Sequence, residues 1–414
     1  MANRIYPRHL EPRLRTALGD TPVVMLTGAR QSGKSTLALK IAAEAGLPYV
    51  TLDDATTLAA TRDAAAFLQG LGERAVIDEV QRAPWLFPAI KVAVDRARRP
   101  GRFLLTGSAN VLLVPKVSES LAGRMEILRL WPLSQGEILG IRERFLEALF
   151  EKRQPALPHT KTRELEIESV VARGGYPELV ARDSAARREA WLSAYVTTLI
   201  ERDVRDLANI EGLSDLPRVL GLLAARTGAL LNVAEVSRDS GVAHTTLKRY
   251  LALLEAAYIV APLSAWSRNV GKRLIKAPKL YFPDSAVAAY LARASAEYLR
   301  ADRGMLGPLL ENFALGELRK QADWAKRAVE IHYFRTASGQ EVDFVLEHRD
   351  GRVAGVEVKA ARTLSGGEFA GLRTLAAAIG DKFVRGVVLY LGERALQFAD
   401  RLWAMPVSAL WRMQ

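Results

Sequence analysis

The strongest chemical signal in the sequence is a glycine-rich segment near the N-terminus. The pattern G-x-x-x-x-G-K-[ST] is met in full by Gly28, Ala29, Arg30, Gln31, Ser32, Gly33, Lys34 and Ser35, with Thr36 next. In such a loop the backbone N–H groups surround a β-phosphate, the lysine charge lies on the β- and γ-phosphate oxygens, and the last hydroxyl can bind Mg²⁺. This segment therefore predicts a site for ATP and Mg²⁺, with Ser35 as a metal ligand.

Two adjacent carboxylates at the end of an apolar run supply the second half of such a site. The run Ala75–Ile77 is followed directly by Asp78 and Glu79. In nucleotide hydrolysis one carboxylate orients Mg²⁺ and another polarises the attacking water, so we expect Asp78 in the first role and Glu79 in the second. A plain solvated loop start is the alternative. A further apolar run, Tyr49–Asp53, lies between Lys34 and Asp78 in the chain. This order leaves space in the sheet for a strand between the strand before the glycine-rich loop and the strand that ends in Asp78, as in hydrolytic ring and switch ATPases.

Three further polar residues close to these runs are candidates for the hydrolysis step. Ser108 and, as a second choice, Asn110 follow the apolar run Phe103–Thr106 and could sense the γ-phosphate. Arg124 precedes the run Met125–Leu130 and, in a ring of subunits, could reach a neighbour's γ-phosphate as an arginine finger. The alternatives are a turn of small polar residues for Ser108 and Asn110, and a salt-bridged surface position for Arg124.

A helix-turn-helix pattern with a basic segment lies in the middle of the chain. The helical runs Val233–Asp239 and His244–Ala256 flank a turn with Gly241, and Tyr258–Trp266 and Lys279–Phe282 can form wing strands. Contacts to DNA phosphates need positive charge, for which the candidates are Arg268, Lys272, Arg273, Lys276 and Lys279. Contacts to bases need the exposed face of the second helix, where the candidates are His244, Thr245, Thr246, Lys248 and Arg249. A structural or protein-contact role is the alternative for both sets.

Carboxylates recur in a β-hairpin pattern near the C-terminus. If Arg349–Gly351 forms a three-residue loop with Gly351 left-handed, Val342 faces Val358, Phe344 faces Val356 and Leu346 faces Ala354. Every apolar residue then pairs with an apolar one, which selects this register. Asp343 lies opposite Glu357 on the other face of the hairpin, and Lys359 points the same way.

This hairpin resembles the D…E-x-K motif of the PD-(D/E)xK restriction-endonuclease-like fold. Facing carboxylates repel unless a cation lies between them, and in that fold the acids hold Mg²⁺ beside a lysine that positions the attacking water. The resemblance implies that Asp343 and Glu357 are metal ligands and that Lys359 takes part in catalysis. It also implies an upstream helical carboxylate, Glu311 or, as a second choice, Glu317. A platform that binds nucleic acid without cleaving it is the alternative.

Six segments together resemble a family of bacterial and archaeal ATPases of the AAA+ type. They are GARQSGKST, VIDEVQRAP, FLLTGSAN, SLAGR, GGYPE (Gly174–Glu178) and IERDV (Ile200–Val204). Members of that family carry a C-terminal domain of unknown function, and the resemblance spans nearly the whole chain. It implies an ATPase but assigns no substrate.

Composition and length limit the classes of protein that fit. The chain has 414 residues, of which 49% are hydrophobic and 25% charged, which is typical of globular proteins and suits two or three domains. The absence of cysteine excludes disulfides, Cys-ligated zinc and thiol catalysis. We find neither an apolar run of about 18 residues nor a signal peptide, so we expect a cytoplasmic protein without a membrane partner. The net charge of +12 favours a polyanionic partner such as nucleic acid.

The order of apolar runs and helical stretches predicts an α/β multidomain chain. We expect a parallel-sheet P-loop ATPase core of the AAA+ type in residues 1–132, a helical lid in 133–230, a winged helix in 231–283 and a restriction-endonuclease-like α/β domain in 284–414. The expected function is Mg²⁺-dependent ATP hydrolysis coupled to conformational work on nucleic acid, with DNA favoured and a homo-oligomer as one arrangement. The alternative is a signalling or interaction ATPase whose winged helix and C-terminal domain bind a protein partner and do not cleave.

Overall fold

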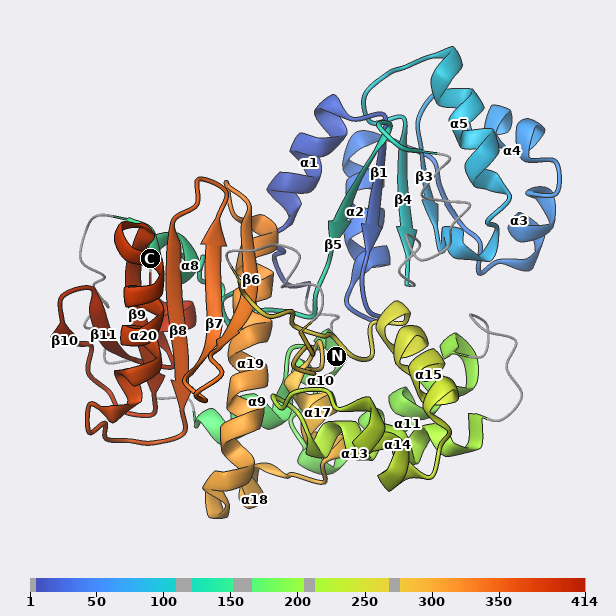
Figure 1. The fold of residues 1–414 in the computed structure, drawn as a ribbon. Helices are drawn as coiled ribbons and strands as arrows, with labels where there is room; N and C mark the ends of the chain where they lie inside the picture. Colours follow the sequence, from blue (N-terminus) through green and yellow to red (C-terminus); the bar gives the residue numbers. More distant parts are fainter. Residues whose placement is uncertain (1–4, 109–120, 152–165, 205–212, 268–275, 414) are drawn as a thin grey trace. The chain divides into compact units, whose positions relative to one another are not determined.

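The chain folds into two compact units (Figure 1). A computed structural model describes residues 5–108, 121–151, 166–204, 213–267 and 276–413. The first unit, called here the N-terminal unit, contains Pro7–Pro132 and Ala252–Ile259. The second, called the C-terminal unit, contains Met1–Tyr6, Leu133–Leu251 and Val260–Gln414. No helix in the described ranges is both long enough and apolar enough to span a membrane.

The described part of the N-terminal unit is built on a parallel sheet of five strands in the order β2-β3-β4-β1-β5. Its strands are β1 (Val23–Thr27), β2 (Tyr49–Thr51), β3 (Ala75–Asp78), β4 (Phe103–Gly107) and β5 (Met125–Arg129). Every residue of β1, β3 and β4 is buried, as expected for continuous apolar runs in a parallel sheet covered on both faces. We expected a strand between the one that precedes the glycine-rich loop and the one that ends in Asp78. This is confirmed, because β4 lies between β1 and β3, while β2 lies beyond β3.

Helices connect these strands and complete the core. They are α1 (Glu11–Asp20), α2 (Lys34–Ala45), α3 (Ala55–Ala60), α4 (Ala64–Gly70), the 3-10 turn η1 (Val80–Arg82) and α5 (Leu86–Arg96). Phe87, Ile90 and Val94 of α5 pack with Met25 and Leu105 in one apolar cluster. These residues are spaced three and four apart, which places them on one face of α5.

Helices occupy the described part of residues 133–225, as predicted, but they pack within the C-terminal unit. They are α7 (Gln135–Leu139), α8 (Phe145–Leu149), α9 (Ile167–Arg173), α10 (Pro177–Val180), α11 (Ala185–Thr198), the π-helix η3 (Leu199–Val204), η4 (Leu213–Asp215) and α13 (Leu216–Ala225). Helix α19 (Arg303–Trp324) holds this segment through side chains. The N–H of Gln135 donates to Glu317 Oε2 at 2.9 Å, and Lys320 Nζ donates to the carbonyl of Leu133 at 3.0 Å. The segment that we expected to act as a lid is therefore anchored to α19.

A helix-turn-helix follows, with shorter strands than predicted. Helices α14 (Val233–Ser240) and α15 (His244–Ala256) flank the turn at Gly241. In place of full wing strands, the described residues form isolated β-bridges, in which Lys279 pairs with both Leu230 and Leu263. Two short helices, α17 (Ser285–Leu291) and α18 (Ala296–Ala301), lead into α19.

The described part of the C-terminal unit contains a mixed sheet of six strands in the order β10-β11-β9-β8-β7-β6. Its strands are β6 (Val329–Arg335), β7 (Glu341–His348), β8 (Val353–Lys359), β9 (Phe383–Tyr390), β10 (Leu396–Ala399) and β11 (Leu402–Pro406). Short 3-10 turns η5 (Gly367–Phe369) and η6 (Gly380–Lys382) flank α20 (Ala370–Ile379), and α21 (Ala409–Arg412) ends the unit. Leu372 and Leu375 of α20 pack with Val342 and Val345 of β7 in the apolar core.

The predicted hairpin register is confirmed where β7 and β8 pair, but the predicted alternation of faces is wrong at one place. Phe344 lies opposite Val356 and Leu346 opposite Ala354. A β-bulge between β6 and β7 adds one residue to β7 between Val342 and Val345, which places both valines in the core against α20. Phe344 contacts Tyr281 instead of sharing the face of Val342. A prediction that side chains alternate strictly between the two faces of a strand does not reveal such an insertion.

Candidate nucleotide site and carboxylate cluster

The glycine-rich loop follows β1 and leads into α2, as its pattern predicts. Gly28 adopts φ +144°, and a Cβ atom at this position would collide with the carbonyl oxygen of Leu130, so only glycine fits here. Lys34 lies at the start of α2, is 4% exposed, and donates from Nζ to the carbonyls of Gly28 and Ala29 at 3.0 and 2.9 Å. The ammonium group is therefore held inside the loop that the sequence assigns to phosphate.

Two features of the loop fit a bound phosphate group. Arg8 donates to the carbonyls of Ser32 and Trp131 at 2.7 and 2.6 Å, which ties the loop to the segment after β5. The hydroxyl oxygen of Ser32 is buried and has no hydrogen-bond partner among the described residues. A buried hydroxyl in the same loop as the Lys34 ammonium group is suited to an anionic oxygen, because an unmet buried hydrogen bond otherwise costs free energy. Arg8 lies outside the loop pattern, and no sequence motif predicts its contacts with the loop.

Asp78 lies at the end of β3 and accepts three hydrogen bonds. Ser35 Oγ donates to Oδ1 at 3.0 Å, Tyr49 OH donates to Oδ2 at 2.9 Å, and Thr106 Oγ1 also donates to Oδ1. Burial, followed by the charge of Asp78, raises the pKa of Tyr49, so its hydroxyl stays protonated and donates. The structure thus brings together Ser35 and Asp78, the two residues predicted to hold Mg²⁺ here. Tyr49 and Thr106 were not predicted, although Thr106 is a polar residue at the end of a buried strand.

Glu79 is held in a left-handed conformation next to Ser108. Its φ is +58°, which is rare for a residue with a side chain, and its N–H donates to Thr106 Oγ1 at 3.1 Å. Gln81 donates to both the Glu79 carboxylate and Ser108 Oγ, and Ser108 Oγ donates to Glu79 Oε2 at 3.4 Å. The predicted neighbours Glu79 and Ser108 therefore meet, and Gln81 is an addition. Asn110 lies outside the described residues.

Arg124 lies where the parallel strands begin, whereas the loop lies where they end. It directly precedes β5, whose first residue Met125 is level with Val23 at the start of β1. Its guanidinium forms a two-pronged ion pair with Asp95, with Nε–Oδ1 at 2.5 Å and Nη2–Oδ2 at 3.0 Å. Within one chain Arg124 is therefore a salt-bridged residue, and its role as an arginine finger stays a prediction about an assembly.

The hairpin carboxylates meet in the C-terminal unit. The N–H of Asp343 donates to Glu357 Oε2 at 3.2 Å, the N–H of Val358 donates to Asp343 Oδ2 at 2.9 Å, and Lys359 Nζ donates to Glu357 Oε1 at 2.6 Å. Burial, followed by the charge of Asp343, raises the pKa of Glu357 to about 8, against the opposing effect of Lys359. Asp343, Glu357 and Lys359 thus form one cluster, as the register predicts.

A second lysine, which the sequence placed in the basic wing, lies in this cluster. The Lys279 side chain is 4% exposed, and its Nζ lies 2.5 Å from Glu341 Oε1, 2.9 Å from Glu311 Oε1 and 3.5 Å from Asp343 Oδ1. Burial opposes its charge, but the surrounding carboxylates outweigh burial and raise the pKa of Lys279. Burial and Asp343 raise the pKa of Glu311 to about 7. The assignment of Lys279 to a DNA-facing surface is therefore wrong.

The carboxylate cluster as folded fits ammonium groups better than a divalent ion. Lys279 lies between Glu311 and Asp343, where the resemblance to nucleases implies a metal, and Lys359 neutralises Glu357. Glu317, the second choice, is fully buried elsewhere and pairs with Lys320 at 2.7 Å. Each predicted ligand already has an internal partner, so metal binding by Glu311, Asp343 and Glu357 stays a prediction.

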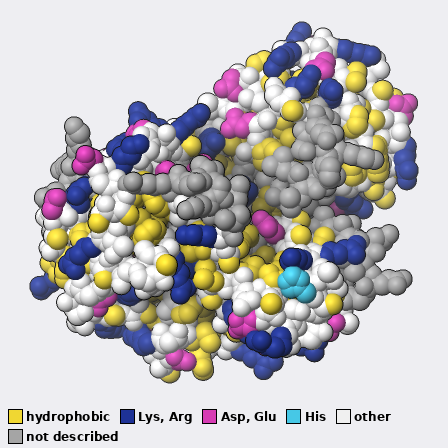
Figure 2. All heavy atoms as spheres, in the orientation of Figure 1, with side chains coloured by type: hydrophobic (Ala, Val, Ile, Leu, Met, Phe, Trp, Pro, Cys, Tyr) yellow, Lys and Arg dark blue, Asp and Glu magenta, His cyan; other side chains and the backbone are white. Residues whose placement is uncertain are grey.

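The second helix of the helix-turn-helix exposes four of the five predicted base-contact residues, and the fifth, Thr246, is half-buried. His244, Thr245, Lys248 and Arg249 are exposed, while Leu247, Tyr250 and Leu254 are buried. Figure 2 shows Lys and Arg side chains on the surface of this part of the molecule. Lys276 is also exposed. Arg268, Lys272 and Arg273 lie outside the described residues.

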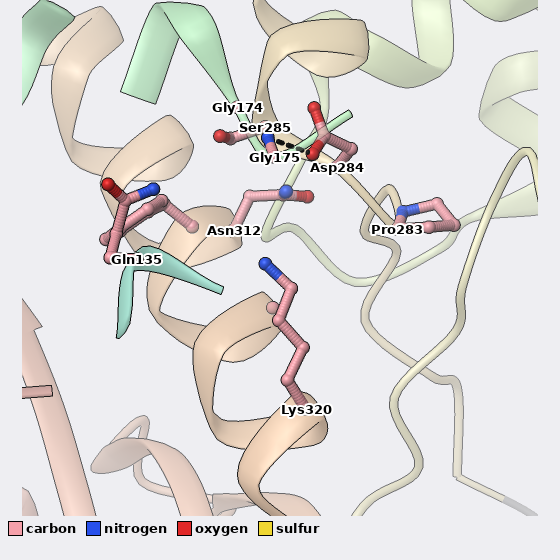
Figure 3. Close-up of a pocket in the computed structure, with 10 residues that line it drawn as sticks. Gln135, Gly174, Gly175, Pro283, Asp284, Ser285, Asn312 and Lys320 are labelled. Atoms are coloured by element: carbon pink, nitrogen blue, oxygen red, sulfur yellow. Dashed lines mark hydrogen bonds between the residues drawn. The ribbon is translucent and has the colours of Figure 1, made fainter. Parts of the chain in front are cut away.

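Gly174 and Gly175 of the segment GGYPE line a small polar cavity in the C-terminal unit (Figure 3). The N–H of Gly175 donates to Asp284 Oδ2 at 2.8 Å, and a side chain on Gly175 would collide with the carbonyl of Leu133. Burial raises the pKa of Asp284. The cavity, of about 10 Å³, has room for about one water molecule. This segment therefore supports the packing of the unit.

Three family descriptions match the chain. "AAA domain" matches residues 20–139, the domain of unknown function DUF8612 matches residues 164–298, and the domain of unknown function DUF4143 matches residues 306–410. The first match contains the glycine-rich loop, Asp78 and Glu79, and its parallel sheet is that of a P-loop ATPase core. The third contains the carboxylate cluster except Lys279.

Similar proteins are found in mycobacteria and archaea. Uncharacterized protein Rv2008c of Mycobacterium tuberculosis and uncharacterized protein Mb2031c of Mycobacterium bovis are each 33% identical over 406 residues, which covers 97% of this chain and 84% of each relative. The solved Walker-type ATPase PABY2304 of Pyrococcus abyssi is 18% identical with a TM-score of 0.37, covering 69% of this chain and 96% of that one. A STAND signal-transduction ATPase of Pyrococcus horikoshii is 11% identical with a TM-score of 0.27, covering 78% and 46%. The chain belongs to the family of the two mycobacterial proteins, and its AAA domain makes it a P-loop ATPase with a C-terminal domain of unknown function.

Proposed function

We propose that this protein hydrolyses ATP with Mg²⁺ and uses the hydrolysis to drive a conformational change on nucleic acid, with DNA as the favoured partner. The bound Mg²⁺ and ATP supply the reactive γ-phosphoryl group and the charge that stabilises its transfer. Lys34, which now donates to loop carbonyls, would donate to phosphate oxygens of the bound nucleotide, and Ser35 and Asp78 would hold the metal. Glu79, positioned by Gln81 and Ser108, accepts a proton from the attacking water.

The observation that carries the proposal is the path of α15. Its first half, within the C-terminal unit, exposes Thr245, Lys248 and Arg249, whereas Ala252–Ile259 belongs to the N-terminal unit. Directly after the helix, Tyr258 OH lies 3.0 Å from Thr27 Oγ1. Thr27 is the last residue of β1, immediately before the loop. The helix therefore carries an exposed basic face, and the turn that directly follows it contacts the strand that precedes the phosphate loop.

Tyr258 is suited to transmit a displacement between the phosphate loop and α15. It adopts φ +55° and is 7% exposed, and the guanidinium of Arg129 lies 5.6 Å from the centre of its ring. A residue held in a strained conformation by its surroundings is not free to absorb a displacement. A shift of the loop on phosphate binding would therefore move the end of α15, and DNA held by α15 would bias the loop in return.

Neutralising the exposed cations Lys248, Arg249 and Lys276 together is expected to weaken DNA binding and reduce its salt dependence. Each lost phosphate contact lowers the slope of log affinity against log salt by about 0.9, so the slope should fall by up to about 3. Fluorescence anisotropy with a labelled duplex over a range of salt concentrations measures this. Replacing Lys91, Arg96 and Arg98 on the N-terminal unit removes the same charge and should leave the slope unchanged. An equal loss in both triple variants would show an effect of net charge and would exclude α15 as the DNA-contact surface.

A second candidate is a signalling or interaction ATPase whose C-terminal unit binds a protein and does not cleave. Lys279 favours the absence of cleavage, because it neutralises Glu311 and Asp343 internally. Incubation of the full chain with DNA and Mg²⁺ or Mn²⁺, followed by gel analysis, tests this point. Cuts that disappear in Asp343→Asn would contradict it. ATP turnover that is indifferent to DNA would favour the second candidate over the first.

A further inference from the structure

We infer that Glu330, His332 and Glu347 form a binding site for a divalent transition-metal ion of the Zn²⁺ class. Each of the three side chains offers one ligand atom, and these atoms lie within 4.8 Å of one another. Glu330 and His332 belong to β6 and Glu347 to β7. The site shares no residue with the nucleotide site or with the cluster around Lys279.

The strand register brings the three side chains to one face. Glu330 lies directly opposite Glu347 in the antiparallel pair, and His332 follows Glu330 by two residues. Residues two apart on a strand, and residues opposite each other, point to the same side of the sheet. Two carboxylates that face each other in this way destabilise the pair unless a cation lies between them. The imidazole of His332 lies beside them, with its Nε2 at 3.3 Å from Glu330 Oε2.

Two further side chains contact the proposed metal ligands and orient them. Ser264 Oγ lies 2.9 Å from His332 Nδ1, and Trp266 Nε1 donates to Glu347 Oε2 at 3.2 Å. When Nδ1 donates its proton to Ser264, Nε2 keeps a lone pair directed toward the carboxylates. A hydrogen bond to the other ring nitrogen is how metal-binding histidines are commonly held. These outer contacts hold the orientation of the imidazole ring and of the Glu347 carboxylate, and the Ser264 hydroxyl is able to accept the Nδ1 proton.

The backbone holds these outer partners in place. The N–H of Trp266 donates to the carbonyl of Tyr333 at 2.6 Å, and the N–H of Tyr333 donates to the carbonyl of Ser264 at 3.1 Å. The segment containing Ser264 and Trp266 is therefore joined to β6 by a single parallel β-bridge between Ala265 and Tyr333. A metal ion held by β6 and β7, with this segment as its outer support, would fix three backbone segments together.

The ligand types select the metal class. Imidazole nitrogen is a ligand that Zn²⁺ and related transition metals take, and carboxylate oxygens also bind Zn²⁺, whereas Ca²⁺ and Mg²⁺ prefer oxygen ligands alone. The His332 side chain is 10% exposed and that of Glu330 is 72% exposed. One ligand is thus fixed in a buried position and one is reachable from solvent, which provides a path by which an ion can enter. The competing arrangement is a simple ion pair of protonated His332 with Glu330.

Titration of the full chain with ZnCl₂ tests the site, after chelator treatment and without nucleotide. We expect one Zn²⁺ to bind, measured by calorimetry, and Co²⁺ to give a visible absorption band in its place. Glu347→Gln and His332→Ala should each lower the affinity at least tenfold. Ser264→Ala should lower it about tenfold, because outer partners of metal ligands have effects of that size. His244→Ala, which removes an exposed histidine on α15, should leave the affinity unchanged.

Several outcomes would overturn the inference. The first is no saturable binding by folded wild-type protein, as expected if His332 only pairs with Glu330. A second is unchanged affinity in Glu347→Gln and His332→Ala. A third is loss of binding in Asp343→Asn, which would place the ion in the Lys279 cluster. Circular dichroism of each variant checks that it is folded, and the conservative Glu347→Gln variant decides the result if His332→Ala does not fold.

Discussion

Glu79→Gln is expected to bind ATP as the wild type does and to turn it over at least about 100-fold more slowly, the usual loss when a general base is removed. The amide has nearly the shape of the carboxylate and can still contact Gln81 and Ser108, but it cannot accept a proton from water. Phosphate release measures turnover, and a fluorescent ATP analogue measures affinity. Equal turnover in Glu79→Gln and wild type would remove Glu79 from the mechanism.

Lys34→Ala provides the comparison for this prediction. It removes the ammonium group that lies inside the loop at 3.0 and 2.9 Å from two carbonyls, so nucleotide affinity should fall together with turnover. Lys40→Ala removes a charge from the same helix, where Lys40 pairs with Glu11 on the surface, and should leave both quantities unchanged. The two site variants thus separate binding from hydrolysis. Retained affinity in Lys34→Ala would contradict the assignment of the loop.

Lys279→Met is expected to destabilise the protein by about 3–5 kcal/mol, the usual cost of removing one partner of a buried ion pair. Methionine preserves the length and apolar stem of the side chain but leaves Glu311, Glu341 and Asp343 without their shared ammonium group. Unfolding in denaturant, followed by circular dichroism, measures the loss.

The loss should depend on pH in a defined direction. The pKa of Glu311 is already raised to about 7 in the folded protein, and Lys279 is one of the groups that hold it down. A carboxyl with a raised pKa favours folding while it is protonated, and this contribution is lost as the pH rises through the folded-state value. Removing Lys279 raises the pKa further, so Lys279→Met should be more destabilising at about pH 8 than at about pH 6.

Two variants control for other effects at this site. Lys276→Met, three residues earlier and exposed, should change stability by less than about 0.5 kcal/mol. Adding Glu311→Gln to Lys279→Met should recover part of the loss, because it removes one uncompensated carboxylate. If Lys279→Met and Lys276→Met are equally stable, Lys279 does not neutralise the cluster.

The N-terminal sheet could be predicted from the sequence because its signals are local. Its buried strands are continuous apolar runs, so β3 and β4 end within one residue of the apolar runs that predict them. The contact of Ser35 with Asp78 follows from parallel strands that end at one edge. The register of β7 and β8 was predictable for the same reason, since apolar pairing selects it.

Contacts made across long distances in the sequence could not be predicted. Arg8 reaches the carbonyl of Trp131, and Lys279 reaches Glu311 and Asp343, with no pattern in the sequence that joins them. The bulge in β7 adds a residue that periodicity does not reveal. Strand β10 has only exposed residues and so lacks the apolar alternation by which strands are recognised. Tyr258 was predicted to lie in a wing strand, but it follows the end of α15 by two residues, and its hydroxyl lies 3.0 Å from Thr27 Oγ1.

The most direct test of the proposed coupling is the ATP turnover rate of wild type and Tyr258→Phe, each with and without saturating duplex DNA. Tyr258→Phe removes only the hydroxyl that lies 3.0 Å from Thr27 Oγ1, and Tyr298→Phe, on α18, is the matched control. We predict that DNA raises turnover severalfold in wild type and Tyr298→Phe, while Tyr258→Phe keeps its basal rate and loses the stimulation. Wild-type turnover that is the same with and without DNA would contradict the proposed function, and full stimulation in Tyr258→Phe would contradict the proposed path.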